Sequence, residues 1–401
     1  MGRLTGPNPC RGKRGHEMPD QFEQWNIADY RNELPYSNRV SIPILLQAFS
    51  STSSSYKYLF FLSLLEVLEE ERFTSRVLRL DRILLQMLVR AYYPHAYFRL
   101  SFGANDRIAQ ELDRLGRHLS INNRTGASAE ARLRSAIASC DYTDNSLLAL
   151  VPYRLIAPFF AQELRGKRDA ERNRMILHLA ESRFESVRPF YCFTGDCRSI
   201  ILHHEWMLYF HENLKLVKSF ISWNWLTYMQ RRNPAVPNIQ LKLFPPHSRG
   251  TLTVQTEFYR TVLQQQTFHC IYSGQRLSAE DFSLDHFLPW SFVAHDQLWN
   301  LIPVSQSINV SKSDNLPSLA RYFTQFVRMQ HQALLLYRGN PGKIPWRRIA
   351  EPYVADLRLT SEDILDPGKL AAGLRTMIEP LHALASSQGF PHGWEMPLTS
   401  R

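Results

Sequence analysis

Apolar residues recur at steps of three and four along much of the first half of the chain. The clearest run is Trp206, Phe210, Leu214, Val217 and Ile221. Its steps of 4, 4, 3 and 4 place all five side chains on one stripe of a helix, which should face a core. The apolar run that begins at Tyr56 predicts the start of a buried helix. These patterns predict a helical domain over residues 20–232.

The helical pattern stops at residues 233–250, which contain four prolines. Each proline restricts its own φ and the conformation of the residue before it, so we do not expect a helix to run through this stretch. We predict that it is a linker between two parts of the chain.

Past the linker, residues 282–289 predict a short strand that leads into a loop, and residues 299–304 predict a second strand. Ser305 is placed to cap a helix that carries Asn309. Residues 251–320 are therefore predicted to form a ββα module.

The two ends of the chain differ in composition. Residues 1–19 are rich in Gly, Pro and basic side chains and predict a disordered segment. The helical pattern returns after Pro317 and predicts a C-terminal helical region over residues 321–401. The predicted fold class is α+β, a mostly helical protein with an embedded ββα module.

The chain carries 47 Lys and Arg against 37 Asp and Glu, a net charge of +10. Such a balance favours a polyanionic partner, because basic side chains neutralise phosphates and release counterions. The segment 251–320 has three bases and six acids, a net charge of −3, so the rest of the chain carries +13. If nucleic acid is the substrate, the flanking regions must help to hold its backbone.

The five cysteines are scattered and odd in number, and the sequence shows no signal-peptide pattern. This favours a reducing compartment over a secreted disulfide framework. The longest apolar run, Tyr58 to Leu65, is too short to span a bilayer. We therefore expect a cytoplasmic protein with no membrane segment.

Phosphodiester hydrolysis requires a base that deprotonates a water molecule and positive charge near the phosphate. Three side chains can meet these needs, two of them by holding a metal ion. Asp285 offers a carboxylate oxygen suited to Mg²⁺, and Asn309 can add a carbonyl oxygen without adding charge. Histidine changes charge near physiological pH, so His286 suits the role of general base.

The segment around these residues resembles the HNH superfamily and, within it, the HNH domain of the RNA-guided CRISPR effector nucleases. There an Asp-His pair precedes a Pro and a Ser-Phe, and is followed by an Asn, a second Asn nine residues later and a Lys-Ser-Asp-Asn-hydrophobic-Pro tail. This chain has Asp285-His286, Pro289, Ser291-Phe292, Asn300, Asn309 and the tail Lys312 to Pro317.

The resemblance implies that residues 251–320 form an HNH nuclease domain with the ββα-metal fold. It implies two catalytic residues, His286 as the general base and Asn300 as the residue that orients the histidine loop. It also implies Asp285 and Asn309 as the metal ligands.

Two further residues are candidates for contact with the substrate. The resemblance implies Lys312 as a phosphate contact. His295 lies in the loop after the Asp-His pair and is the second candidate, although an exposed loop histidine needs no function.

Two departures from the family pattern bear on the metal. Many HNH proteins have His where Asn309 stands, and this Asn-terminated variant favours Mg²⁺, with Mn²⁺ as the alternative, over Zn²⁺ on ligand hardness. Many also carry two Cys-x-x-Cys pairs that hold a structural zinc. Only Cys270 is present here, so we do not expect a structural zinc.

A second constellation, Cys192 and Cys197 with His203 and His204, could also hold a metal. Its spacing is not that of common zinc sites. The favoured interpretation is a buried cysteine and a helix-capping histidine.

These observations predict a metal-dependent HNH endonuclease that hydrolyses DNA phosphodiester bonds and nicks duplex DNA, since one centre used once cuts one strand. The architecture resembles stand-alone HNH effectors of bacterial anti-phage and restriction systems, with Zorya-type systems as one setting. The expected partners are double-stranded DNA and proteins of such a defence system. The alternatives are a homing or mobile-element endonuclease, and a non-catalytic nucleic-acid-binding adaptor with a relict HNH site. The sequence does not indicate the oligomeric state.

Overall fold

The computed structural model describes residues 34–50, 52, 54–103, 106–118, 127–139, 147–245 and 250–397. The disorder predicted for residues 1–19 lies outside these residues. The described chain is mostly helical with two small sheets, which confirms the predicted α+β fold class. Within these ranges, no helix combines the length and the apolar character needed to cross a membrane.

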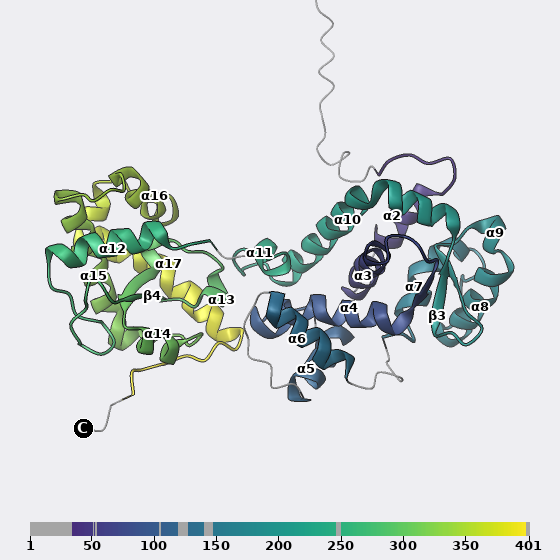
Figure 1. The fold of residues 1–401 in the computed structure, drawn as a ribbon, viewed down its shortest axis with the longest axis horizontal. Helices are drawn as coiled ribbons and strands as arrows, with labels where there is room; N and C mark the ends of the chain where they lie inside the picture. Colours follow the sequence, from purple (N-terminus) through teal and green to yellow (C-terminus); the bar gives the residue numbers. More distant parts are fainter. Residues whose placement is uncertain are drawn as a thin grey trace, which may run out of the picture.

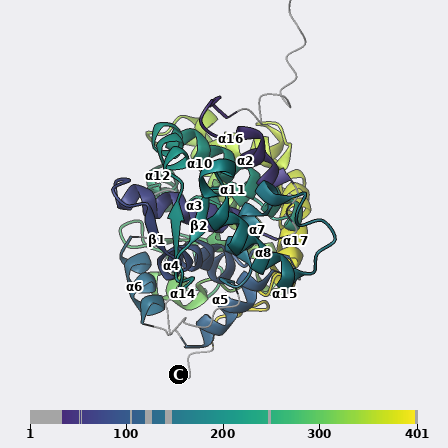
Figure 2. The same cartoon turned by 90° about the vertical axis from the view of Figure 1, so that its right-hand side faces the viewer.

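Two hydrophobic cores divide the described chain. One contains buried side chains from Leu34 to Leu243, and the other contains buried side chains from Phe258 to Phe390. The two bodies lie side by side along the long axis of the molecule (Figure 1), so that one stands behind the other when the molecule is turned (Figure 2).

The first body packs around α3 (Tyr56–Glu70) and α10 (His204–Arg232). α3 buries ten of its fifteen residues, as the apolar run at its start predicts. The other helices of this body are α2 (Ile42–Ser50), α4 (Leu80–Tyr92), η1 (Tyr93–Tyr97), α5 (Arg107–His118), α6 (Ala127–Ala138), α7 (Val151–Ile156), η2 (Ala157–Phe160), α8 (Asp169–Ser182) and α9 (Phe184–Val187).

α10 carries the predicted apolar stripe. Four of the five stripe residues are buried in the first core, and Leu214 packs against the same core while half-buried. Asn213 has non-helical dihedral angles (φ −119°, ψ 21°), so the helix kinks just before Leu214. The prediction that this stripe faces a core is confirmed.

A three-stranded antiparallel sheet lies at one side of the first body. β3 (Ser199–Leu202) is the central strand and pairs with β1 (Val77–Arg79) on one edge and β2 (Tyr191–Phe193) on the other. The sequence did not predict this sheet, because strands of three or four residues are too short for alternation to be recognised.

α10 ends at Arg232, where the proline-rich stretch begins. Asn233 closes the helix, since its side-chain amide donates to Met229 O at 2.9 Å and to Ser101 O at 2.8 Å. The helix therefore stops where the prolines predict. A short helix, α11 (Ile239–Leu243), then forms inside the predicted linker.

α11 connects the first body to α13 (Trp290–Val293) of the second. Asn238 donates its side-chain amide to Val293 O at 2.8 Å. The buried ammonium of Lys242 donates to Phe292 O. Both bonds reach the last carbonyls of α13, which have no partner within that helix.

The second body contains the predicted ββα arrangement. β4 (Ser283–His286) pairs antiparallel with β5 (Leu301–Val304), and α14 (Gln306–Lys312) follows. Ser305 Oγ accepts a hydrogen bond from the N–H of Ile308 at 3.4 Å, so it caps α14 as predicted. The remaining elements of this body are α12 (Thr253–Gln265), α13, η3 (Leu298–Asn300), α15 (Leu319–Gly339), α16 (Trp346–Leu357), η4 (Asp363–Leu365) and α17 (Pro367–Ser387).

Side chains from three surrounding helices meet at the start of β5. Tyr259 of α12 and Gln330 of α15 both donate to Leu301 O, at 2.7 and 2.8 Å. Tyr353 of α16 donates to Gln330 Oε1 at 2.6 Å. All of these groups are buried, so the hairpin is held by polar bonds as well as by apolar packing.

Candidate functional site

β4 ends with Asp285 and His286, which lie opposite Ile302 and Leu301 of β5. Successive side chains of a strand point to opposite faces, so the carboxylate and the imidazole enter different surroundings. Asp285 is 2% exposed, whereas the His286 side chain is 14% exposed. The strand therefore presents one residue to the interior and the other towards solvent.

The Asp285 carboxylate is held from both sides. Tyr272 donates its hydroxyl to Oδ2 at 3.0 Å, and Lys312 Nζ lies 3.2 Å from Oδ1. Burial raises the pKa of Asp285, and the Lys312 ammonium opposes that rise. Lys312 also donates to His286 O at 2.6 Å, so one ammonium ties α14 to the end of β4.

His286 has a carboxylate of its own. Its Nε2 lies 2.8 Å from Asp296 Oδ1, in the loop between α13 and η3. Asp296 was missed by the sequence analysis, because no local pattern links it to a histidine ten residues earlier. Only the closure of the loop brings the two side chains together.

Asn300 fastens the chain that follows His286. It accepts from Leu288 N and donates to Leu288 O, both at 2.9 Å, and its own carbonyl accepts from Phe287 N at 2.8 Å. Asn300 is fully buried. These contacts fix the chain that follows His286, and the orienting role of Asn300 in catalysis stays a prediction.

Asn309 projects from α14 towards β4. Its Nδ2 donates to Ser283 Oγ at 2.7 Å and to Leu284 O at 3.2 Å. The amide nitrogen is thus directed at the strand, and no hydrogen bond from a described residue reaches the side-chain oxygen Oδ1 of Asn309.

The oxygens of Asp285 and Asn309 fit the chemistry of a hard divalent cation. Mg²⁺ prefers carboxylate, carbonyl and water oxygens. Each carboxylate oxygen of Asp285 accepts one hydrogen bond, and a carboxylate oxygen has a second lone pair. Asn309 carries a side-chain oxygen of the same kind on the neighbouring helix, and its role as a metal ligand stays a prediction.

The two predicted substrate contacts lie deeper than the sequence suggests. Lys312 is 0% exposed, and its ammonium meets Asp285 inside the domain. His295 is partly buried against the Trp299 ring, and its Nδ1 accepts from Gln297 N at 3.3 Å. Burial lowers the pKa of His295 to about 4, so this ring is uncharged at neutral pH. Contact of either residue with a phosphate stays a prediction.

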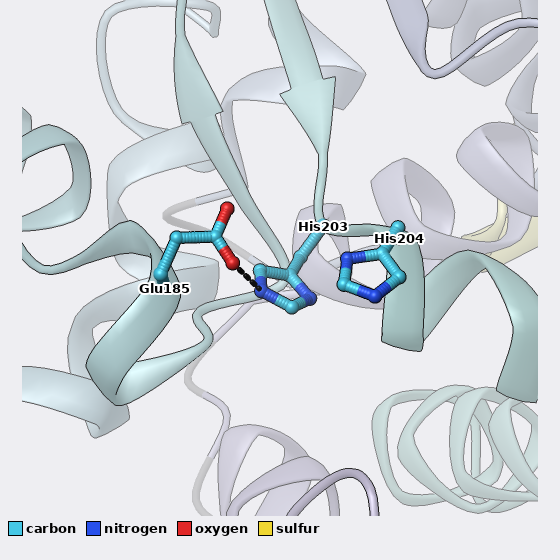
Figure 3. Close-up of side chains that lie close together, drawn as sticks. All are labelled: Glu185, His203 and His204. Atoms are coloured by element: carbon cyan, nitrogen blue, oxygen red, sulfur yellow. Dashed lines mark ion pairs between the residues drawn. The ribbon is translucent and has the colours of Figure 1, made fainter.

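The second candidate metal site, formed by two cysteines and two histidines, does not bring its four side chains together. Cys192 is buried in β2, while Cys197 is exposed at a residue with φ +54°. Among the described residues, the group that comes together is instead Glu185, His203 and His204 (Figure 3), whose ligand atoms lie within 4.8 Å of one another.

His203 in this group is a helix cap. Its Nδ1 accepts the N–H of Glu205 at 3.2 Å at the start of α10, so the proton of the neutral ring sits on Nε2, 3.5 Å from Glu185. A protonated nitrogen cannot bind a metal, and the start of a helix disfavours a cation. The predicted combination of buried cysteine and helix-capping histidine is confirmed.

Comparison with known proteins found a match in the second body alone. The model of the HNH endonuclease family matches residues 270–318, a segment that includes β4, β5 and α14. No curated protein and no solved structure matches the chain. Residues 270–318 of this mostly helical chain therefore form an HNH endonuclease domain.

Proposed function

We propose that this protein is a divalent-metal-dependent endonuclease that hydrolyses phosphodiester bonds of duplex DNA at its HNH centre. The observation that carries the proposal is the placement of Asp285 and His286 at the end of β4 beside Asn309 of α14. A carboxylate and an imidazole on β4 are thereby gathered beside an amide oxygen on α14.

In this proposal His286 takes the proton from the attacking water. Asp285 and Asn309 would hold the cation, Mg²⁺ or Mn²⁺, which when bound stabilises the negative charge that develops on the phosphate. Asn300 keeps the histidine loop against β5, and Lys312 keeps α14 against β4. A single centre of this kind breaks one bond in each binding event, so the expected product is a nick.

The charge distribution supports a nucleic-acid substrate that extends beyond the HNH segment. Residues 251–320 are net negative while the rest of the chain is strongly positive. Basic side chains outside the domain would therefore supply the long-range attraction to the DNA backbone.

The experiment that tests the proposal is cleavage of supercoiled plasmid by the full chain with Mg²⁺, with Mn²⁺ and with EDTA. We expect conversion to open circles by the wild type, no conversion in EDTA, and none by His286→Ala or Asn309→Ala. His178→Ala, which changes an exposed histidine of α8, is the matched control and should cleave like the wild type. Cleavage that survives in both HNH variants would refute the assignment of the centre.

A role in anti-phage defence stays a prediction from the sequence. Challenge of bacteria with phage, with and without His286→Ala, tests it. Loss of protection in the variant would support a nuclease effector. Unchanged function in the variant would favour the adaptor with a relict site, whereas cleavage at one preferred DNA sequence would favour the mobile-element endonuclease.

A further inference from the structure

We infer that Asp296 is the positioning residue for His286: it holds the ring proton on Nε2 and so makes Nδ1 the nitrogen that accepts the proton from water. This inference rests on the proposed function, because it specifies how the general base of that centre is prepared.

The first step is the hydrogen bond itself. Nε2 of His286 and Oδ1 of Asp296 are 2.8 Å apart, and the two side chains are 14% and 30% exposed. An ionised carboxylate only accepts hydrogen bonds, so Nε2 must carry the proton. In a neutral imidazole the lone pair then lies on Nδ1, and no bond from a described residue engages that nitrogen.

The second step is the rigidity of the loop that carries Asp296. The main-chain carbonyl of Asp296 accepts from Gln255 Nε2 of α12 at 2.9 Å. Ala294, just before this point, turns the chain in the left-handed region at φ +52°. The carboxylate is therefore held by the fold rather than by its contact with His286 alone.

A second brace reaches the same loop from α16. The ring of Trp299 packs on His295, next to Asp296, with the centroids 5.2 Å apart. Trp299 in turn donates its Nε1–H to Asp356 of α16 at 2.7 Å. Since both braces come from helices outside residues 270–318, the position of Asp296 depends on the whole second body.

The third step concerns charge. When His286 accepts a proton, the ring becomes an imidazolium, and a carboxylate at hydrogen-bond distance stabilises it. An amide of the same shape supplies no charge and can donate as well as accept, so it no longer fixes which nitrogen is protonated. Asp296→Asn therefore removes the proposed role while preserving the volume of the side chain.

The test compares Asp296→Asn, Asp296→Ala and Asp296→Glu with Asp281→Ala in the full chain. Asp281 is an exposed acid of the same domain, so its variant matches the loss of one negative charge near the substrate. We expect kcat for plasmid nicking to fall by about 10²–10³ in the Asn and Ala variants, with KM changed less than about twofold. Asp296→Glu should recover part of the loss, and Asp281→Ala should leave kcat unchanged.

A second readout is independent of cleavage. The ¹⁵N resonances of the His286 ring, identified by their loss in His286→Ala, report which nitrogen carries the proton. The wild type should show a protonated Nε2 and a bare Nδ1, and Asp296→Asn should show a mixture of the two tautomers. A folded Asp296→Asn variant with the wild-type spectrum and the wild-type kcat would overturn the inference. Absence of cleavage by the wild type would count against the proposed function alone, since the ring spectra still decide the role of Asp296.

Discussion

His286 and His203 each have a carboxylate beside one ring nitrogen, but the two pairs differ in distance, in exposure and in the use of the second nitrogen. His286 Nε2 is 2.8 Å from Asp296, and both side chains are partly exposed. His203 Nε2 is 3.5 Å from Glu185, and its ring is fully buried in the first body. Nδ1 of His203 is already committed to the N–H of Glu205.

The comparison shows that a histidine beside a carboxylate becomes a candidate for chemistry only when one nitrogen remains for it. In His203 the helix start uses Nδ1, and Glu185 stands 77% exposed with no hydrogen bond to the ring. In His286 the carboxylate uses one nitrogen and leaves the other. Four variants test this contrast, and we take them from the largest expected effect to the smallest.

Removal of each ring should separate the two roles in a single assay. His286→Ala should lower plasmid nicking by about 10²–10⁴, the range for loss of a general base. His203→Ala should nick within about threefold of the wild type at a temperature where both proteins are folded. Equal losses in the two variants would contradict the contrast.

His203→Ala, which should leave nicking nearly unchanged, should lower the stability of the first body. His203→Ala removes a side chain that caps α10 and should cost about 1–3 kcal/mol of unfolding free energy from the lost cap and the void. Asn is among the best capping residues, so His203→Asn should recover about 1 kcal/mol of this. Urea unfolding followed by fluorescence measures both values. No difference between the Ala and Asn variants would exclude a capping role.

The pH dependence of stability should carry the signature of His203. Burial lowers the pKa of this ring below its ordinary value, with Glu185 opposing the shift. As pH falls through the ordinary value of about 6.5, the unfolded chain binds a proton that the folded ring does not. The free energy of unfolding should therefore decrease below about pH 6.5 in the wild type, and His203→Asn should lack this component. A wild type and variant with parallel pH profiles would contradict it.

The smallest effect is expected at the exposed carboxylate. Glu185→Gln should change the unfolding free energy by less than about 0.5 kcal/mol, because the Glu185 carboxylate is exposed to solvent and makes no hydrogen bond to the ring. It should leave nicking unchanged, in contrast to Asp296→Asn. Thermal unfolding at low and high salt measures it, and a loss above about 1 kcal/mol would mean that Glu185 is a true partner of His203.

The elements of the HNH segment could be predicted because their signals are local. Ser305 caps α14, and β4 and β5 are each continuous segments of four residues. Asp296 and Tyr272 could not be predicted as partners of His286 and Asp285, because their roles depend on how separate loops close. The motif identifies Asp285, His286 and Asn300, but not the hydrogen-bond partners that reach the first two from separate loops.

The first body shows the same limit at a larger scale. The stripe of α10 could be recognised because its period persists over four helical turns. The sheet formed by β1, β2 and β3 could not, because its strands are short and β1 is separated from β3 by more than a hundred residues. Pairing between such distant strands follows from packing, which a local pattern does not record.

The buried bonds of Tyr259, Gln330 and Tyr353 around the start of β5 bear on how this domain could be transplanted. Residues 270–318 contain the reactive groups, but the hydroxyls and amide that complete the interior of the hairpin come from α12, α15 and α16. A graft limited to the motif would leave buried carbonyls without donors. A transplanted HNH segment would therefore need the helices of the second body that surround it, and also the donors of α11 that bind the last carbonyls of α13.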